Sequence, residues 1–224
     1  YYPCRIRSSL ICHNRNPNSH AGGIRMQYSP SIHDSTVTLN QAYSGGGCSI
    51  VNGGTLSNCV VSYNLSAYTW FAGGIHVQDV NVAYKCRIYD TLVVGNTNMG
   101  VCFSKGNSNP ADSGPGPKQM VNCIVRDNTR HGLWLGGTNN WISNCVVSGN
   151  GGVGVYGYNG YLRNCLISGN ASNGVLIHAN CQTALVSACT IVDNLAANEG
   201  AGVRVEATAP GLVQFSSCIV AGNG

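Results

Sequence analysis

The sequence predicts an all-β solenoid: a single-stranded, right-handed parallel β-helix of about nine coils, with little or no α-helix. Two observations support this class. A short apolar run that ends in Asn recurs nine times, and a second run that begins near a Gly follows most of these asparagines. A repeat of this length is typical of solenoids, because each unit buries its apolar side chains only by stacking on its neighbours.

The nine asparagines mark one end of the repeating unit. The clearest units read NCIVRDN, NCVVSGN, NCLISGN and ACTIVDN, at residues 122–128, 144–150, 164–170 and 188–194. Where coils lie over one another, equivalent residues stack, so we expect the asparagines to form a ladder of side-chain amides. The nine positions are Asn14, Asn40, Asn64, Asn96, Asn128, Asn150, Asn170, Asn194 and Asn223.

The columns before each asparagine predict a strand. The residue three positions before it is Val or Ile in all nine repeats, and the residue five positions before it is Cys, Ser or Thr. Branched residues fit strands better than helices. Because side chains alternate along a strand, these two columns share one face, which we expect to point into the core. The columns two and six positions before the asparagine are mostly polar and should point outward.

The run after the asparagine predicts a second strand in each repeat. It reads GGIRM, GGIHV, HGLWL, GVGVY and AGVRV at residues 22–26, 73–77, 131–135, 152–156 and 201–205. Gly and Asn at its borders tolerate the backbone of sharp corners. Two or three short strands per repeat fit a β-helix, whereas leucine-rich repeats need a Leu-rich consensus and propellers need longer blades.

Composition indicates one domain over residues 1–224, interrupted by loop insertions at 65–74 and 104–118. Charged residues make up 9% of the chain and the net charge is +4, and we expect no nucleic-acid partner. No apolar run approaches the roughly 18 residues of a membrane span. Neither end shows a cap of the kind that solenoids need, so we expect a segment of a longer chain or ends that pair with something.

The twelve cysteines divide into two groups. One group falls in the inward column, where a thiol acts as a small buried hydrophobe, and we expect it to be reduced. This group is Cys59, Cys123, Cys145, Cys165, Cys189 and Cys218. Within the other group, one or two disulfide bonds are possible. It is Cys4, Cys12, Cys48, Cys86, Cys102 and Cys181. No CxxC spacing occurs, so no zinc site is expected.

These repeats, with SCIVAGN at 217–223, resemble right-handed β-helix proteins of the pectin-lyase-like superfamily, and most closely its secreted bacterial surface members. The resemblance covers nearly the whole chain. It implies an extracellular or cell-surface location in a bacterium. It specifies the fold and not the activity, because the same β-helix fold occurs in polysaccharide lyases, glycoside hydrolases, epimerases, adhesins and phage tailspikes.

An enzyme of this family needs charged groups on one sheet. The resemblance implies a Lys, Arg or His base for a lyase, often with acidic residues that hold calcium, and two or three clustered Asp for a hydrolase. The eight acidic residues of this chain are scattered, and none adjoins another. They are Asp34, Asp79, Asp90, Asp112, Asp127, Asp193, Glu199 and Glu206. We therefore expect no cofactor, and calcium only if the chain is a lyase.

The densest group of charges is the one candidate for catalysis. Arg126, Asp127, Arg130 and His131 lie together in the sequence, shortly after the insertion at 104–118. An Arg and a His beside a loop could neutralise and deprotonate a uronate. The simpler interpretation is a solvated corner with a local Asp–Arg pair.

A second candidate is a carbohydrate-binding face along the run that follows each asparagine. Trp134 and Tyr156 should be stacked on adjacent coils, where aromatic rings flanked by Arg and His suit a sugar chain. The alternative is that loops such as 65–74 cover these rings. The outward row reads Arg25, Ser49, His76, Cys102, Trp134, Tyr156, Leu176 and Arg204. Two residues further on are Gln78, Ser104, His178 and Glu206. The binding candidates are Arg25, His76, Gln78, Trp134, Tyr156, His178 and Arg204.

A third feature is an aliphatic stripe that concerns assembly. The column four positions before each asparagine should face outward, yet it is mostly apolar, and such a strip usually marks an interface. It reads Leu10, Thr36, Val60, Leu92, Ile124, Val146, Leu166, Thr190 and Ile219. Self-association could use this stripe or the open ends of the rod.

Three functions follow from these observations. The first is a non-catalytic surface rod that is structural or adhesive and binds polysaccharide on one sheet face. The second is a polysaccharide lyase or glycoside hydrolase that acts on an acidic glycan. The third is a self-assembling filament unit.

Overall fold

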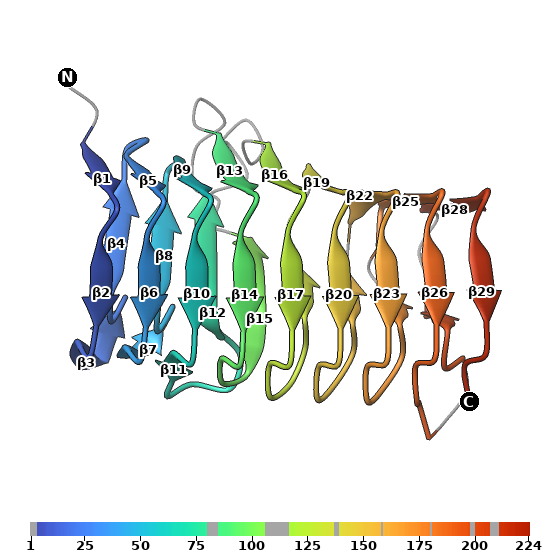
Figure 1. Ribbon diagram of the computed structural model, residues 1–224. Helices are drawn as coiled ribbons and strands as arrows, with labels where there is room; N and C mark the ends of the chain where they lie inside the picture. Colours follow the sequence, from blue (N-terminus) through green and yellow to red (C-terminus); the bar gives the residue numbers. More distant parts are fainter. Residues whose placement is uncertain are drawn as a thin grey trace.

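The computed structural model describes residues 4–79, 85–105, 117–136, 139–157, 159–179, 181–197, 200–206 and 211–224, with only the backbone of residues 79 and 105. These residues form one stack of windings (Figure 1). All paired strands in the stack's four sheets run parallel, and the described residues include no helix. The predicted all-β solenoid is confirmed, since two of the sheets hold nine strands each.

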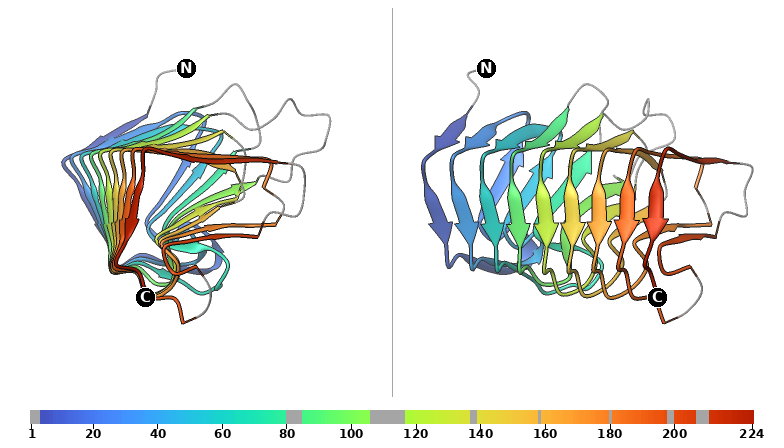
Figure 2. Two further views of the ribbon diagram at one scale, coloured as in Figure 1. Left: turned by 90° about the vertical axis from the view of Figure 1, so that its right-hand side faces the viewer. Right: turned by 45° about the vertical axis from the view of Figure 1, so that its right-hand side comes forward.

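Each winding passes through sheet A, then sheet B, then sheet D, and these sheets surround the interior (Figure 2). Sheet A consists of β1 (Arg5–Arg7), β5 (Ser31–His33), β9 (Gly54–Ser57), β13 (Cys86–Tyr89), β16 (Lys118–Val121), β19 (Asn140–Ser143), β22 (Gly160–Arg163), β25 (Thr183–Ser187) and β28 (Leu212–Ser216). Sheet B consists of β2 (Leu10–Cys12), β6 (Thr36–Thr38), β10 (Val60–Ser62), β14 (Leu92–Val94), β17 (Ile124–Arg126), β20 (Val146–Ser148), β23 (Leu166–Ser168), β26 (Thr190–Val192) and β29 (Ile219–Ala221).

Sheet D has eight strands, and a short sheet C lies between sheets B and D in the early windings. Sheet D consists of β4 (Ile24–Gln27), β8 (Cys48–Val51), β12 (Ala72–Asp79), β15 (Met99–Lys105), β18 (Leu133–Leu135), β21 (Val155–Gly157), β24 (Val175–Ile177) and β27 (Val203–Val205). Sheet C consists of β3 (Arg15–His20), β7 (Gln41–Ser44) and β11 (Leu65–Ser66). The expected loop at 65–74 is therefore partly strand, and most of the insertion at 104–118 lies outside the described residues.

The core contains the two columns that the sequence assigned to it. Val125, Val147 and Ile167 have no exposed surface, and Cys145 is 1% exposed. All twelve cysteines are free thiols, so the column is reduced as predicted and the bridges left open elsewhere are not formed. Burial raises the pKa of the Cys102 thiol to about 12, although the charge of Lys118 opposes this shift.

The asparagine ladder runs unbroken through the stack. Each side-chain Nδ2 donates to the Oδ1 of the next asparagine at 2.9–3.1 Å. The same Oδ1 accepts the backbone N–H of the preceding asparagine at 2.9–3.1 Å. The ladder therefore satisfies buried backbone groups at the turn where the chain leaves sheet B.

The column six positions before each asparagine forms the corner between sheets A and B. Its side chains point outward as predicted, and all nine residues have φ between 47° and 55°, so they turn the chain. Asn and Asp suit this left-handed backbone. Their exposed side chains form a second ladder, in which Asn164 donates to Asn144 at 2.9 Å and Asn122 donates to Asp90 at 3.1 Å. Asp90 thus has a role in the corner.

The aliphatic stripe faces outward on sheet B, in register from β2 to β29. Leu10 is 67% exposed and Ile124 is 42% exposed, so described residues leave much of the stripe uncovered. Its use in self-association stays a prediction. No described helix is both long and apolar enough to cross a membrane.

Removing one buried amide of the inner ladder should destabilise the fold strongly. Asn150→Ala deletes the acceptor of Asn128 and the donor to Asn170. We expect a loss of about 3 kcal/mol in the free energy of unfolding, because several buried polar groups lose partners. The matched control is Asn144→Gly at the exposed corner, where Gly tolerates the positive φ, with an expected loss below about 1 kcal/mol. Equal losses in chemical denaturation would contradict the assigned role of the inner ladder.

Thiol titration should distinguish the buried column from the surface. Nine cysteines are buried, and Cys4, Cys12 and Cys218 are exposed or half-buried. We expect a thiol reagent to label at most these three in the folded protein at mildly alkaline pH, because the packed core shields the buried thiols from the reagent. All twelve should react after unfolding without reductant. Labelling of fewer than twelve cysteines in the unfolded protein would show that disulfide bonds exist.

Candidate functional site

The outward row that the sequence identified on sheet D is a continuous register in the structure. Strand pairing aligns Trp134 with Tyr156, and the remaining members join in the predicted order. The row runs Arg25, Ser49, His76, Cys102, Trp134, Tyr156, Leu176 and Arg204. Its members differ in accessibility, since Ser49, His76, Cys102 and Leu176 are buried.

The early part of the row is covered, which removes His76 from the surface candidates. The Phe71 ring packs on the His76 ring with centroids 4.8 Å apart. The His76 Nε2 lies 2.9 Å from the Ser104 Oγ. Burial, and then the charge of His20, lower the pKa of His76 to about 4. A buried neutral His here supports the packing of residues 67–71 over sheet D and cannot reach a ligand outside. Gln78 is half-buried and Arg25 is exposed two windings earlier.

The middle of the row carries a half-exposed group of four rings, which we call the aromatic strip: Trp134, Tyr156, His131 and His178. The Tyr156 ring stands at its centre. It stacks on His131 at 5.6 Å and 19°, and it meets the Trp134 ring edge-on at 5.4 Å. The His178 ring lies 6.0 Å from it in a T-shaped arrangement. The strip thus spans neighbouring windings of sheet D.

Residues 67–71 also reach the edge of the aromatic strip. The Trp70 ring, 52% exposed, meets Trp134 edge-on at 5.6 Å. Arg130 holds this loop in place, because its guanidinium lies 5.2 Å from the Trp70 ring centroid and donates to the Thr69 carbonyl at 3.0 Å. This cation–π contact leaves Arg130 half-buried. The loop therefore covers the aromatic strip, as the sequence allowed, but it covers only one edge of it, at Trp134.

His131 is a neutral hydrogen-bonding group at neutral pH. Its Nδ1 accepts the Val153 backbone N–H at 3.0 Å, so the ring proton resides on Nε2. Burial, with a smaller contribution from the Arg130 charge, lowers the pKa of His131 to about 4. The ring can donate to an oxygen of a ligand without carrying charge.

The structure divides the candidate catalytic cluster into two pairs. Arg126 and Asp127 form an exposed ion pair at 2.5 Å at the end of β17 in sheet B. Arg130 and His131 follow the ladder residue Asn128 and turn toward sheet D, where they contact Thr69, Trp70 and Tyr156. The simpler interpretation of a local Asp–Arg pair matches this geometry.

The last members of the row are a neutralised charge pair. The Arg204 guanidinium lies 2.9 Å from the Glu206 carboxylate on and just after β27. Within the described ranges, no group of three or more His, Cys, Asp or Glu side chains could hold a metal ion.

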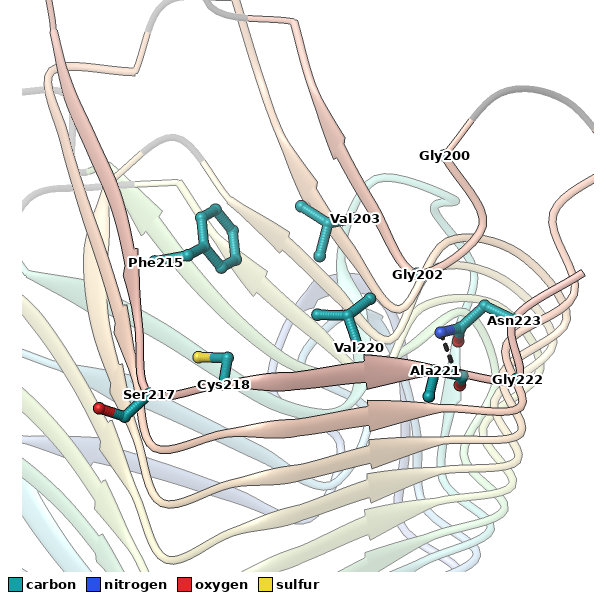
Figure 3. Close-up of a pocket in the computed structure, with 10 residues that line it drawn as sticks. All are labelled: Gly200, Gly202, Val203, Phe215, Ser217, Cys218, Val220, Ala221, Gly222 and Asn223. Atoms are coloured by element: carbon teal, nitrogen blue, oxygen red, sulfur yellow. Dashed lines mark hydrogen bonds between the residues drawn. The ribbon is translucent and has the colours of Figure 1, made fainter.

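One hollow is the open interior at the last winding (Figure 3). It measures about 660 Å³ and is lined by core positions, among them Val203, Phe215, Cys218 and Val220. It opens along the long axis of the β-helix and not through the outer face of a sheet.

A second hollow, of about 460 Å³, lies on sheet A around Trp141 and Tyr161. Sequence reasoning missed it, because the strand before each corner was not considered. The available signal was two aromatic residues at the same position, nine before Asn150 and Asn170.

The fold has known relatives. The family described as the right handed beta helix region matches residues 73–224. The chain belongs to this family. The resemblance to pectin-lyase-like β-helices is thereby confirmed, including the hand of the coil. No curated protein matches this right-handed β-helix.

Two solved structures share the fold, both A-modules of mannuronan C-5 epimerases from Azotobacter vinelandii. The AlgE6 module is 15% identical with a TM-score of 0.58, over 86% of this chain and 58% of that chain. The AlgE4 module is 15% identical with a TM-score of 0.56, over 93% of this chain and 65% of that chain. The β-helix thus spans less than two thirds of either module, and at this identity the likeness shows the fold alone.

The buried His76 and the half-buried His131 should make stability depend on pH. The pKa values of His76 and His131 fall from 6.5 to about 4 on folding, so the unfolded chain binds protons more tightly. The contribution of the two histidines to the free energy of unfolding is therefore complete above pH 6.5 and is lost as the pH falls toward 4. In His131→Asn, the free energy of unfolding should fall less steeply over this window. The exposed His13→Asn is the control and should keep the original slope. An unchanged slope in His131→Asn would contradict the lowered pKa of this ring.

Proposed function

We propose that this chain is an extracellular or cell-surface β-helical rod of a bacterium that binds polysaccharide through the aromatic strip of sheet D and does not catalyse a reaction. The observation that carries this proposal is the contiguous, half-exposed arrangement of Trp134, Tyr156, His131 and His178 on neighbouring windings. Aromatic rings with polar atoms at their edges suit a sugar chain, which presents apolar ring faces beside hydroxyls.

The fold neighbours support polysaccharide as the ligand class. Both are modules of mannuronan C-5 epimerases. The rigid parallel windings provide a suitable platform, because rings at one register position lie one strand spacing apart, about 4.8 Å. A neutral His131 could donate to a hydroxyl or a carboxylate of such a chain.

The arrangement of charges favours binding over chemistry. Glu206, just after β27, is paired with Arg204, and Asp127 is paired with Arg126 on another sheet. Paired catalytic carboxylates of glycosidases lie about 5–10 Å apart across the scissile bond. The described residues offer no such pair on sheet D.

A polysaccharide lyase or glycoside hydrolase remains the second candidate. The specific observation in favour of a lyase is that the Tyr156 ring stands between two imidazoles, His131 and His178. Such a group could remove a proton next to a uronate carboxylate, and calcium would be expected only under this alternative. The filament unit is a third candidate, supported by the exposed stripe on sheet B.

Binding should depend on the centre of the strip. We expect Tyr156→Ala to weaken binding of a mannuronan oligosaccharide about tenfold by calorimetry, because ring contacts contribute about 0.5–1.5 kcal/mol each and neighbouring rings lose their support. The control Tyr28→Ala removes a 62% exposed ring elsewhere and should bind like the parent.

The same polymers test the catalytic alternative. Incubation with acidic and neutral polysaccharides should produce no unsaturated uronate, no new reducing ends and no epimerised sugar residues. Turnover that is lost on substituting Tyr156, Arg130 or His131 would overturn the non-catalytic proposal in favour of the enzyme.

A further inference from the structure

Trp141 and Tyr161 form an aromatic pair on a different side of the rod, on the outer face of sheet A. Strand pairing places them side by side on β19 and β22. Their rings stack at 4.1 Å and 14°, and Trp141 is 48% exposed. Neither ring contacts any further ring among the described residues. Stacking between strands stabilises a sheet, but that role alone leaves the surrounding groove unexplained.

The groove beside this pair has the size and chemistry of a small ligand site. It measures about 460 Å³ and extends from β19 to β28, across four neighbouring windings. Because the rings stack on each other, the free face of Tyr161 is directed toward the next winding, where Leu185 is half-buried. Ser143, Ser187, Ser216 and Gln214 supply hydroxyls and an amide, and Ile142, Leu162 and Val186 add apolar surface to the lining. Sites for small ligands span roughly 300–1,000 Å³ and combine apolar walls with a few polar groups.

Arg163 supplies the one charge of this groove. It lies two residues after Tyr161 on the same strand, so its side chain leaves the same face. It is exposed, and no described carboxylate forms an ion pair with it. A guanidinium in this position matches the geometry of a carboxylate, to which it can donate two parallel hydrogen bonds.

We propose that the sheet A groove is a second polysaccharide-binding site, in which a sugar ring packs against Tyr161 and Leu185 while Arg163 holds the carboxylate of an acidic sugar. The groove is too small for a protein partner, since four windings cover roughly 14 Å and stable interfaces bury about 800 Å² on each side. Sheets A and D face different sides (Figure 2), so one rod could hold two glycan segments at once. This inference shares only the ligand class with the proposed function.

The three tryptophans of the chain allow the two sites to be separated. Indole N–H signals of Trp70, Trp134 and Trp141 can be assigned by single substitutions and followed by NMR while a mannuronate oligosaccharide is added. We expect the Trp141 signal to shift and saturate. Arg163→Gln should weaken that response about tenfold for the acidic oligosaccharide, equivalent to ~1.4 kcal/mol, and leave the response to a neutral glucan oligosaccharide unchanged.

The outcomes distinguish this inference from the proposed function. A shift of Trp134 alone would overturn the sheet A site and support sheet D, and a shift of Trp141 alone would do the reverse. If Tyr156→Ala abolishes the Trp141 response, the groove is no independent site and the inference fails. No shift with either sugar overturns both. Trp141→Ala should lower the thermal stability only slightly, because the ring is 48% exposed and loses one cross-strand stack, and sedimentation should show an unchanged mass. A lower mass would mean that the groove joins copies of the chain.

Discussion

The stacking of identical polar turns is the constraint on which the rest of this rod depends. A solenoid must turn its backbone sharply in every winding, and each turn buries N–H and C=O groups that strands alone do not pair. Here the Oδ1 of one asparagine accepts both a backbone N–H and the side-chain amide of its neighbour. Since the bond links each winding to the next, the ladder also keeps the windings in register.

Register then determines the character of every surface. Equivalent positions of successive windings lie one strand spacing apart, so a column in the sequence becomes a row in space. Inward rows become a dry column of thiols and branched aliphatics. Outward rows become an aliphatic stripe on sheet B, an aromatic strip on sheet D and an aromatic pair beside a groove on sheet A. A binding surface needs only a few substitutions in a row that the fold has already aligned.

The acidic residues show how the fold uses its few charges. Asp34 and Asp90 occupy corners with positive φ and accept from the amides of Asn58 and Asn122. Asp127 pairs with its sequence neighbour Arg126. Glu206 pairs with Arg204. Charges used in this way stabilise turns and edges of the rod.

The sequence by itself determined the repeat, the inward columns, the inner ladder and the order of the outward row on sheet D, because all of these follow from periodicity and side-chain alternation. It could not determine which members of that row are accessible: His76 and Trp134 occupy equivalent positions, yet Phe71 buries the first and Trp70 covers only an edge of the second. Only the tertiary structure decided this, and also the separation of Arg126 from His131 and the pairing of Trp141 with Tyr161. Cover and proximity depend on where loops and corners send the chain between windings, and a repeat pattern contains no information on that path.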